Sequence, residues 1–282
     1  MPTPPPAARR RGRPARTVPE RPRALVPLAP AKRIRGTASS RKVLQVLTAF
    51  TPERPIVTVD ALARSVRVPL STAYRYIALL REVGLVTDDG RGGYHLSPRV
   101  VELARASRAA VGFLDIARPV MERLCESSGE TAVLIRRIGD AAVCVERVES
   151  AQRVRLSFDV GSAFPLHRGA SPKVLLAHMG ERERDEYLTR ARRIDPALRQ
   201  RGARFDQELQ AIVRQGWAES TEEITPDIWA VAAPVVEGDR PIAALSVAGP
   251  AYRLTGRQRS KIVSLTRAAA ADISAQLTAL VR

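Results

Sequence analysis

Polar side chains gather at the beginning of one short segment, residues 69–83, which reads PLSTAYRYIALLREV. They combine two hydroxyls, a phenol and an arginine beside one aliphatic residue: Leu70, Ser71, Thr72, Tyr74 and Arg75. Hydroxyl and phenol groups donate hydrogen bonds to phosphate oxygens, and the planar fork of an arginine pairs with O6 and N7 of guanine. These residue types therefore favour contacts with the phosphates and base edges of a nucleic-acid duplex.

The rest of this segment has a helical period. Ala73, Ile77 and Leu80 recur at i, i+4 and i+7, which makes one apolar stripe. Tyr76 and Val83 are expected to widen that stripe toward a core. The polar residues lie off the stripe, so the helix should be held from behind and present its polar N-terminal end to a partner.

The preceding residues complete a motif. Residues 58–66 read as a short helix, with Thr58 as its N-cap and Asp60 in its first turn. Arg67 and Val68 form the turn before the polar-ended helix. A helix, a tight turn and a second helix with a polar end make a helix-turn-helix. An ordinary helical hairpin is the alternative interpretation.

Two strand-like pieces, 84–87 and 94–97, follow this motif. The loop between them is rich in glycine and aspartate and contains Arg91, which is typical of a wing that contacts the DNA backbone. Residues 39–50 read as a first helix, on which Arg41 is available to a phosphate. Its expected apolar stripe is Val43, Leu44, Leu47 and Phe50.

Several motifs, in order and at family-like spacing, resemble the IclR-type transcriptional regulators. They are RKVLQVL at 41–47, LAR at 62–64, PLSTAYR at 69–75, GYHLSP at 93–98, PLHRGAS at 165–171, VAAP at 231–234 and ALSVAGP at 244–250. The match runs from Ser39 to about Leu277. It implies a winged helix-turn-helix, a linker helix and an effector-binding domain, in a homodimer or homotetramer. The family usually has glycine where Arg67 stands, and a left-handed backbone there would cost a non-glycine residue roughly 1 kcal/mol.

The expected fold class is α+β, in four parts. Residues 1–36 are a disordered basic tail, 37–98 the winged helix-turn-helix, 99–112 a linker helix, and 113–282 an antiparallel sheet with packed helices of the GAF or profilin-like type. Strands of the last part are expected at 131–138, 141–148, 153–158, 217–221, 228–236 and 242–247. Helices are expected at 113–128, 170–179, 181–193, 205–215 and from Thr255 onward.

The charge is placed unevenly. The chain carries a formal net charge of +17, and residues 1–36 hold ten Lys or Arg against one Glu, with nine prolines. A segment of this composition cannot bury enough apolar surface to offset its ordering entropy, and its charge indicates a polyanionic partner. Residues 11–14, RGRP, resemble an AT-hook core suited to a narrow minor groove, with a solvated tail as the alternative.

A second candidate site lies at the junction of a loop and a helix. The helix expected from Ala170 presents free backbone N–H groups, which favour an anion. Gly169 permits close approach, Ser171 adds a hydroxyl, and Arg168 could meet a carboxylate in bidentate fashion. The resemblance implies a small-molecule effector enclosed here and by two late strands. By matching position it implicates Gly169, Ala170, Asp227, Trp229, Ala230, Ser246 and Ala248.

Phe158, Phe164 and Leu166 are expected to form the walls of this pocket. Many family members have glycine where Asp227 stands and cysteine where Ala230 stands, so this chain offers fewer polar groups. This favours a more apolar effector, aromatic and carboxylate-containing. The alternative is that Phe158, Phe164 and Trp229 are simply core residues.

Other chemistry has little support. Cys125 and Cys144 lie in apolar stretches and are expected to be buried free thiols. The three histidines have no metal-binding spacing, and no phosphate-loop or dinucleotide fingerprint is present, so neither a metal nor a cofactor is expected. No apolar run is long enough to span a membrane, which makes the cytoplasm the expected location.

The sequence predicts a repressor that binds double-stranded operator DNA. An architectural DNA-binding protein and an enzyme acting on the ligand are the alternatives.

Overall fold

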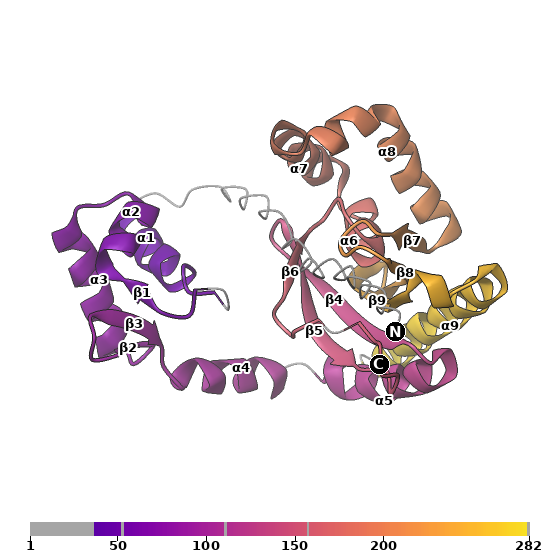
Figure 1. The fold of residues 1–282 in the computed structure, drawn as a ribbon, viewed down its shortest axis with the longest axis horizontal. Coiled ribbons are helices and arrows are strands. Elements are labelled where there is room, and N and C mark those ends of the chain that lie inside the picture. The colour runs from indigo at the N-terminus through magenta and orange to yellow at the C-terminus, as the bar shows by residue number, and fades with distance from the viewer. Residues whose placement is uncertain (1–36, 52–53, 110–111, 157, 281–282) are drawn as a thin grey trace, which may run out of the picture. The chain divides into compact units, whose positions relative to one another are not determined.

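The computed structural model describes residues 37–51, 54–109, 112–156 and 158–280 (Figure 1). The basic tail with its RGRP string lies outside the described residues. The remainder forms two compact units, one of residues up to Ala117 and one from Arg118 onward.

The first unit contains the helix-turn-helix. Its helices are α1 (Ala38–Leu47), α2 (Val59–Val66), α3 (Leu70–Glu82) and α4 (Arg99–Ala109). Its strands β1 (Val57–Thr58), β2 (Val86–Asp88) and β3 (Gly93–Leu96) form an antiparallel sheet in the order β1-β3-β2. The wing is therefore a β2–β3 hairpin, and β3 also pairs with β1, the short strand directly before α2.

Helical periodicity and capping explain these helices. The hydroxyl of Thr58 accepts a hydrogen bond from the Ala61 N–H, as expected of the N-cap of α2. Ala73, Ile77 and Leu80 of α3 pack with the fully buried Leu62 of α2. Arg67 adopts the left-handed conformation at the turn, with φ 54° and ψ 61°. The Nζ of Lys42 donates to its carbonyl over 3.1 Å, which joins α1 to the turn.

Two expectations about this core were wrong. Leu44 is 61% exposed, and Val46 occupies the buried position on α1 instead. Val83 is 47% exposed because it caps the C-terminal end of α3, where the chain turns away at Gly84. The apolar stripe of α3 therefore ends one turn earlier than its sequence suggested.

The second unit is a six-stranded antiparallel sheet with helices. The order of strands is β6-β5-β4-β9-β8-β7. The strands are β4 (Thr131–Ile138), β5 (Ala141–Val148), β6 (Ala163–Pro165), β7 (Ala218–Thr221), β8 (Ile228–Glu237) and β9 (Arg240–Pro250). The helices are α5 (Phe113–Ser128), which begins in the first unit, α6 (Ala170–Ala177), α7 (Glu181–Ile194), α8 (Pro196–Gln215) and α9 (Gly256–Leu280), with a 3-10 turn, η1 (Ala251–Arg253).

The central strands are covered on both faces. Side chains alternate along β9, so Ala244, Ser246 and Ala248 point to one face and Leu245 and Val247 to the other. Helix α6 packs on the first face, where the core also contains residues of α7 and α8. Helix α9 packs against the other face of β8 and β9 (Figure 1). This double cover explains why β9 is buried over nearly its whole length.

Two assignments in this unit differ from the sequence analysis. Residues 153–156 and 158, which were expected in a strand, do not belong to one, and β6 pairs with β5 at the sheet edge instead. The polar stretch before Gly202 is helical: Asp195 caps it, Pro196 starts it, and α8 continues across a break at Gly202, where φ is 42°. The hydrophobic periodicity did not reveal this start of α8, because it is set by the N-cap Asp195 and by Pro196 rather than by apolar residues.

The different burial of two leucines gives a test of the first core. Replacing Leu62 with Ala should destabilise this unit by about 2–5 kcal/mol, because it leaves a cavity at a fully buried position. Hydrogen exchange of peptides from α2 and α3 in the full chain measures the loss. Leu44→Ala is the matched control and should change exchange little; an equal effect of both would contradict this packing.

Candidate nucleic-acid interface and ligand pocket

The N-terminal end of α3 is exposed. Ser71, Tyr74 and Arg75 are exposed, Leu70 is 43% exposed and Thr72 is half-buried. The helix is held from behind by its buried stripe, so these five residues present one polar surface with an aliphatic edge. This is the geometry that recognition of a major groove needs.

The wing and α1 add cationic groups. Arg91 is exposed at the wing tip, and its backbone N–H donates to Oδ1 of Asp89 over 2.8 Å. The Gly93 N–H donates to the same oxygen, and these two hydrogen bonds lower the pKa of Asp89 and fix the shape of the loop. Arg41 is half-buried and lies within 3.4 Å of the Thr37 hydroxyl.

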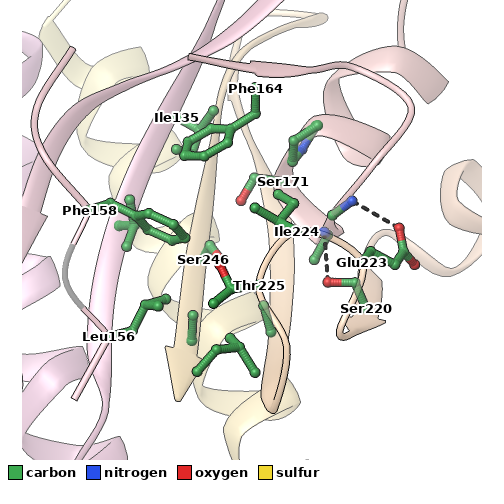
Figure 2. Close-up of a pocket in the computed structure, with 17 residues that line it drawn as sticks. Ile135, Leu156, Phe158, Phe164, Ser171, Ser220, Glu223, Ile224, Thr225 and Ser246 are labelled. Carbon is green, nitrogen blue, oxygen red and sulfur yellow. Dashed lines mark hydrogen bonds between the residues drawn. The ribbon is translucent and has the colours of Figure 1, made fainter. Parts of the chain in front are cut away.

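A pocket lies on the face of the sheet that α6 covers (Figure 2). Its walls are mainly apolar, and Phe158 and Phe164 meet edge to face with ring centroids 5.1 Å apart. Its open volume is about 40 Å³. The lining residues are Val133, Ile135, Leu156, Phe158, Phe164, Gly169, Ala170, Ser171, Pro172, Ser220, Glu223, Ile224, Thr225, Ile228, Ala230, Ser246 and Ala248.

The pocket brings together eight of the twelve residues that the sequence analysis assigned to effector binding or to the pocket wall. They are Phe158, Phe164, Gly169, Ala170, Ser171, Ala230, Ser246 and Ala248. These come from the β5–β6 connection, β6, the start of α6, β8 and β9, so segments far apart in the sequence converge on one cavity.

The other four lie outside the lining. Trp229 neighbours Ala230 on β8, so strand alternation turns it to the opposite face, where Arg259 of α9 stacks over its ring. Asp227 is exposed at the start of β8 with φ 60°. Arg168 pairs with Asp195 at 3.0 Å and faces a neighbouring cavity of about 260 Å³. Leu166 is fully buried in the core rather than in the pocket wall.

The first N–H groups of α6 have partners within the chain. The Gly169 N–H donates to Oε2 of Glu223 over 2.9 Å, and the Ala170 N–H donates to the Ser220 hydroxyl over 3.1 Å (Figure 2). Gly169 has φ 89°, and a Cβ there would meet the Ile224 side chain at 2.4 Å. The positive φ favours glycine here, and any larger residue would also have to displace the end of the Ile224 side chain.

Glu223, Ser220 and Ile224 are pocket residues that the sequence analysis missed. One signal could have found Glu223: Lys173 is the only charged residue of the otherwise apolar α6, and a lysine on a buried helix needs a carboxylate. The ammonium of Lys173, whose residue is 1% exposed, contacts Oε1 of Glu223 at 2.5 Å and Oε1 of Glu208 at 2.7 Å.

A buried polar network lies beside the pocket. Nε2 of His167 donates to Oδ2 of Asp195 over 3.0 Å, since a carboxylate only accepts, and Nδ1 then accepts from the Tyr187 hydroxyl over 2.7 Å. Burial lowers the pKa of His167 despite its acidic partner. Burial alone would raise the pKa of Asp195, but hydrogen bonds from His167 and Leu198 and the charge of Arg168 outweigh it and lower that pKa.

Cys125 and Cys144 are buried free thiols, as the sequence analysis predicted. Burial raises the pKa of Cys144 to about 11, which keeps it an unreactive thiol at neutral pH. Within the described residues, no group of three or more His, Cys, Asp or Glu side chains could hold a metal ion. None of the helices in that part of the chain is long and apolar enough to cross a bilayer.

A helix-turn-helix with a wing, joined to a separate ligand-pocket unit, defines a class of DNA-binding regulators. Comparison with known proteins makes the assignment specific. Residues 39–90 match the IclR helix-turn-helix domain, and residues 108–275 match the bacterial transcriptional regulator IclR C-terminal domain. The chain therefore belongs to the IclR family of transcriptional regulators.

Individual relatives agree with this assignment. The chain is 29% identical over 245 residues to the HTH-type transcriptional regulator KipR of Bacillus subtilis, covering 84% of this chain and 95% of KipR. An IclR regulator of Silicibacter sp. TM1040 superimposes with a TM-score of 0.78 at 27% identity, over 85% of this chain and 96% of that chain. An IclR homologue of Microbacterium hydrocarbonoxydans, solved in complex with 4-hydroxybenzoate, gives a TM-score of 0.71 at 26% identity, over 86% and 100%.

The His167 network predicts a pH dependence of stability. As the pH falls through the ordinary pKa of 6.5, the unfolded chain binds a proton on this histidine before the folded chain does. Stability should therefore be full above pH 6.5 and decline below it, and His167→Gln should flatten the decline between pH 7 and 5. Thermal unfolding at several pH values measures this. His178→Gln, at the C-terminal cap of α6 and outside the network, is the control and should keep the wild-type slope.

Proposed function

We propose that this protein is a repressor that binds a near-palindromic operator as a homodimer or homotetramer and is released by a small aromatic carboxylate. The observation that carries the proposal is the exposed polar end of α3, held rigidly by its buried stripe. Two such helices in one oligomer would read two half-sites one helical turn apart.

The contacts on DNA are assigned by chemistry. Arg75 would read a base edge, because its fork is exposed one turn inside α3. Ser71, Thr72 and Tyr74 would bind phosphates, while Leu70 would contact a base methyl or sugar. Arg41 on α1 and Arg91 on the wing would hold the flanking backbone. Phosphate contacts fix the register, and Arg75 then provides discrimination between bases.

The pocket supports an aromatic effector. Phe158 and Phe164 with Ile135 and Leu156 provide apolar walls, and Ser171 and Ser246 provide hydroxyls within them. One solved IclR homologue carries 4-hydroxybenzoate, a ring with one carboxylate, and we assign the same chemical class to this chain. The N-terminal end of α6 would receive the carboxylate, because its amide groups point toward anions.

The remaining parts follow from these assignments. α4 would serve as the linker helix between residues 99 and 112, and the unit after it would bind the effector and oligomerise. Val101 and Leu103 of α4 are each more than half exposed, which suits a helix that pairs between subunits.

A cytoplasmic DNA-bound regulator would return its effector unchanged, so incubation with 4-hydroxybenzoate should leave that compound intact; a new product would identify an enzyme instead.

Arg75→Ala should weaken operator binding by about 1–3 kcal/mol and relax base preference at one position of each half-site. The operator is first obtained by footprinting upstream of the protein's own gene. Fluorescence anisotropy at fixed salt then compares operator and scrambled duplexes. A footprint spread over any sequence would instead favour an architectural DNA-binding protein.

Arg81→Ala is the matched control, because Arg81 lies on the same helix but pairs with Asp88 at 3.1 Å. It should leave discrimination between the two duplexes unchanged. Equal loss of affinity for both duplexes in Arg75→Ala would assign Arg75 to phosphate contact rather than base reading.

Phe158→Leu should weaken binding of 4-hydroxybenzoate, because it removes the edge-to-face partner of Phe164 and an aromatic contact to the ligand. The expected loss is about 0.5–1.5 kcal/mol, which isothermal calorimetry measures. Tyr252→Leu removes an aromatic ring that is 70% exposed and outside the pocket, and it should bind like wild type. Unchanged affinity in Phe158→Leu would place the ligand elsewhere.

A further inference from the structure

One carboxylate of the chain occupies the anion-binding groups of the pocket. Glu223 accepts the Gly169 N–H through Oε2 (Figure 2), and its Oε1 contacts the Lys173 ammonium. Ser220 takes the next N–H, that of Ala170. The amide groups that would receive an effector carboxylate are therefore already paired, and their principal occupant is itself a carboxylate.

The charges around this carboxylate balance. Lys173 and Arg201 supply two positive charges, and Glu208, which contacts both, and Glu223 supply two negative ones. A second carboxylate at Gly169 would leave one negative charge uncompensated beside a buried group. Such a charge is unfavourable because it would lie close to the carboxylates of Glu223 and Glu208, and like charges at short range repel. An anionic effector and the present position of Glu223 therefore exclude each other.

Space gives the same result independently. The open volume of about 40 Å³ is little more than one water molecule occupies, and a benzene ring needs a cavity nearer 150 Å³. Ile224 and Thr225, the two residues after Glu223, line the pocket, and Ile224 packs against the backbone of Gly169. A ring could enter only if the loop that carries these residues moved outward.

The loop has a place to which Glu223 can move. It lies between Glu222 and Asp227, which have φ of 59° and 60° and so form two sharp bends. Glu223 also borders the neighbouring cavity of about 260 Å³, whose lining includes Arg168 and Arg201. A shift of the loop toward that cavity would open the pocket and keep the Glu223 carboxylate near positive charge.

We propose that Glu223 is a tethered competitor of the effector: it closes the pocket by binding the N-terminal end of α6, and an effector carboxylate enters by displacing it. This rests on the proposed function of the pocket. The cost of displacement lowers affinity for every anionic ligand, whereas a neutral ligand gains nothing from replacing Glu223 at Gly169. The position of the β7–β8 loop would therefore differ between the empty and the occupied pocket.

Glu223→Gln in the full chain tests this inference. Glutamine has one oxygen, so it cannot serve both Lys173 and the Gly169 N–H, and it removes the competing charge. Calorimetry with 4-hydroxybenzoate and with neutral 4-hydroxybenzamide should show about tenfold tighter binding of the acid, the equivalent of one charge-assisted hydrogen bond. The amide should change less than about threefold.

Two further variants complete the design. Glu237→Gln removes an exposed charge at the end of β8, outside the linings of both cavities, and should leave both affinities unchanged. Glu223→Asp keeps a carboxylate for Lys173 but withdraws it from Gly169, so it should tighten binding of the acid even if Glu223→Gln does not fold. Thermal unfolding establishes which variants are folded.

The outcomes separate this inference from the proposed function. Acid binding that appears only in the Glu223 variants supports displacement. If the acid binds wild type and the folded Glu223 variants equally, or if acid and amide change together, displacement is wrong and the effector class stands. If neither compound binds any variant, the aromatic carboxylate class is wrong, and displacement by it is wrong as well.

Discussion

The buried ammonium of Lys173 is the constraint on which the second unit depends. A cation with almost no exposure must be paired, since an uncompensated buried charge costs several kcal/mol. Its partners lie on three different segments: Glu208 on α8, the carbonyl of Glu219 on β7, and Glu223 on the β7–β8 loop. One side chain thereby holds α6 against the helical layer and against the sheet edge. The same contacts bring the N-terminal end of α6 to the pocket and set which groups face a ligand there.

Strand alternation then divides the sheet between two tasks. In β8 and β9 every second side chain faces α6 and the pocket, and the others face α9. The pocket face uses small residues, Ala230, Ser246 and Ala248, which leave room for a cavity, whereas the other face uses Trp229, Leu245 and Val247, which fill the space beneath α9. A one-residue shift in register would exchange these faces. The long β8–β9 pairing therefore protects both the cavity and the core.

The helix-turn-helix unit also divides its side chains between two faces, but here the functional face points outward to solvent. Here the apolar side of α3 is fixed by Leu62 and the rest of a small core, and the polar end projects away from the chain. The tight turn before α3 requires Arg67 in a left-handed conformation, and Lys42 binds its carbonyl. In the first unit the buried side of α3 supports its exposed polar end, and in the second the sheet and its helices enclose the pocket.

The sequence by itself determined the helix-turn-helix, the wing, the α+β class and eight residues that line the pocket. The first three rest on local periodicity, caps and short motifs, which act between neighbours along the chain. Among the pocket residues, Ala230, Ser246 and Ala248 were implied by the resemblance to the IclR family. Tertiary structure alone decided the rest. It turned Trp229 to the far face, drew Arg168 to Asp195, replaced the expected strand at 153–158 with β6, and brought Glu223 to Gly169, 54 residues away in the chain. Alternation along β8 already separates Trp229 from Ala230, and Lys173 already calls for a carboxylate, but which face holds the pocket and which distant charges meet depends on how remote segments pack.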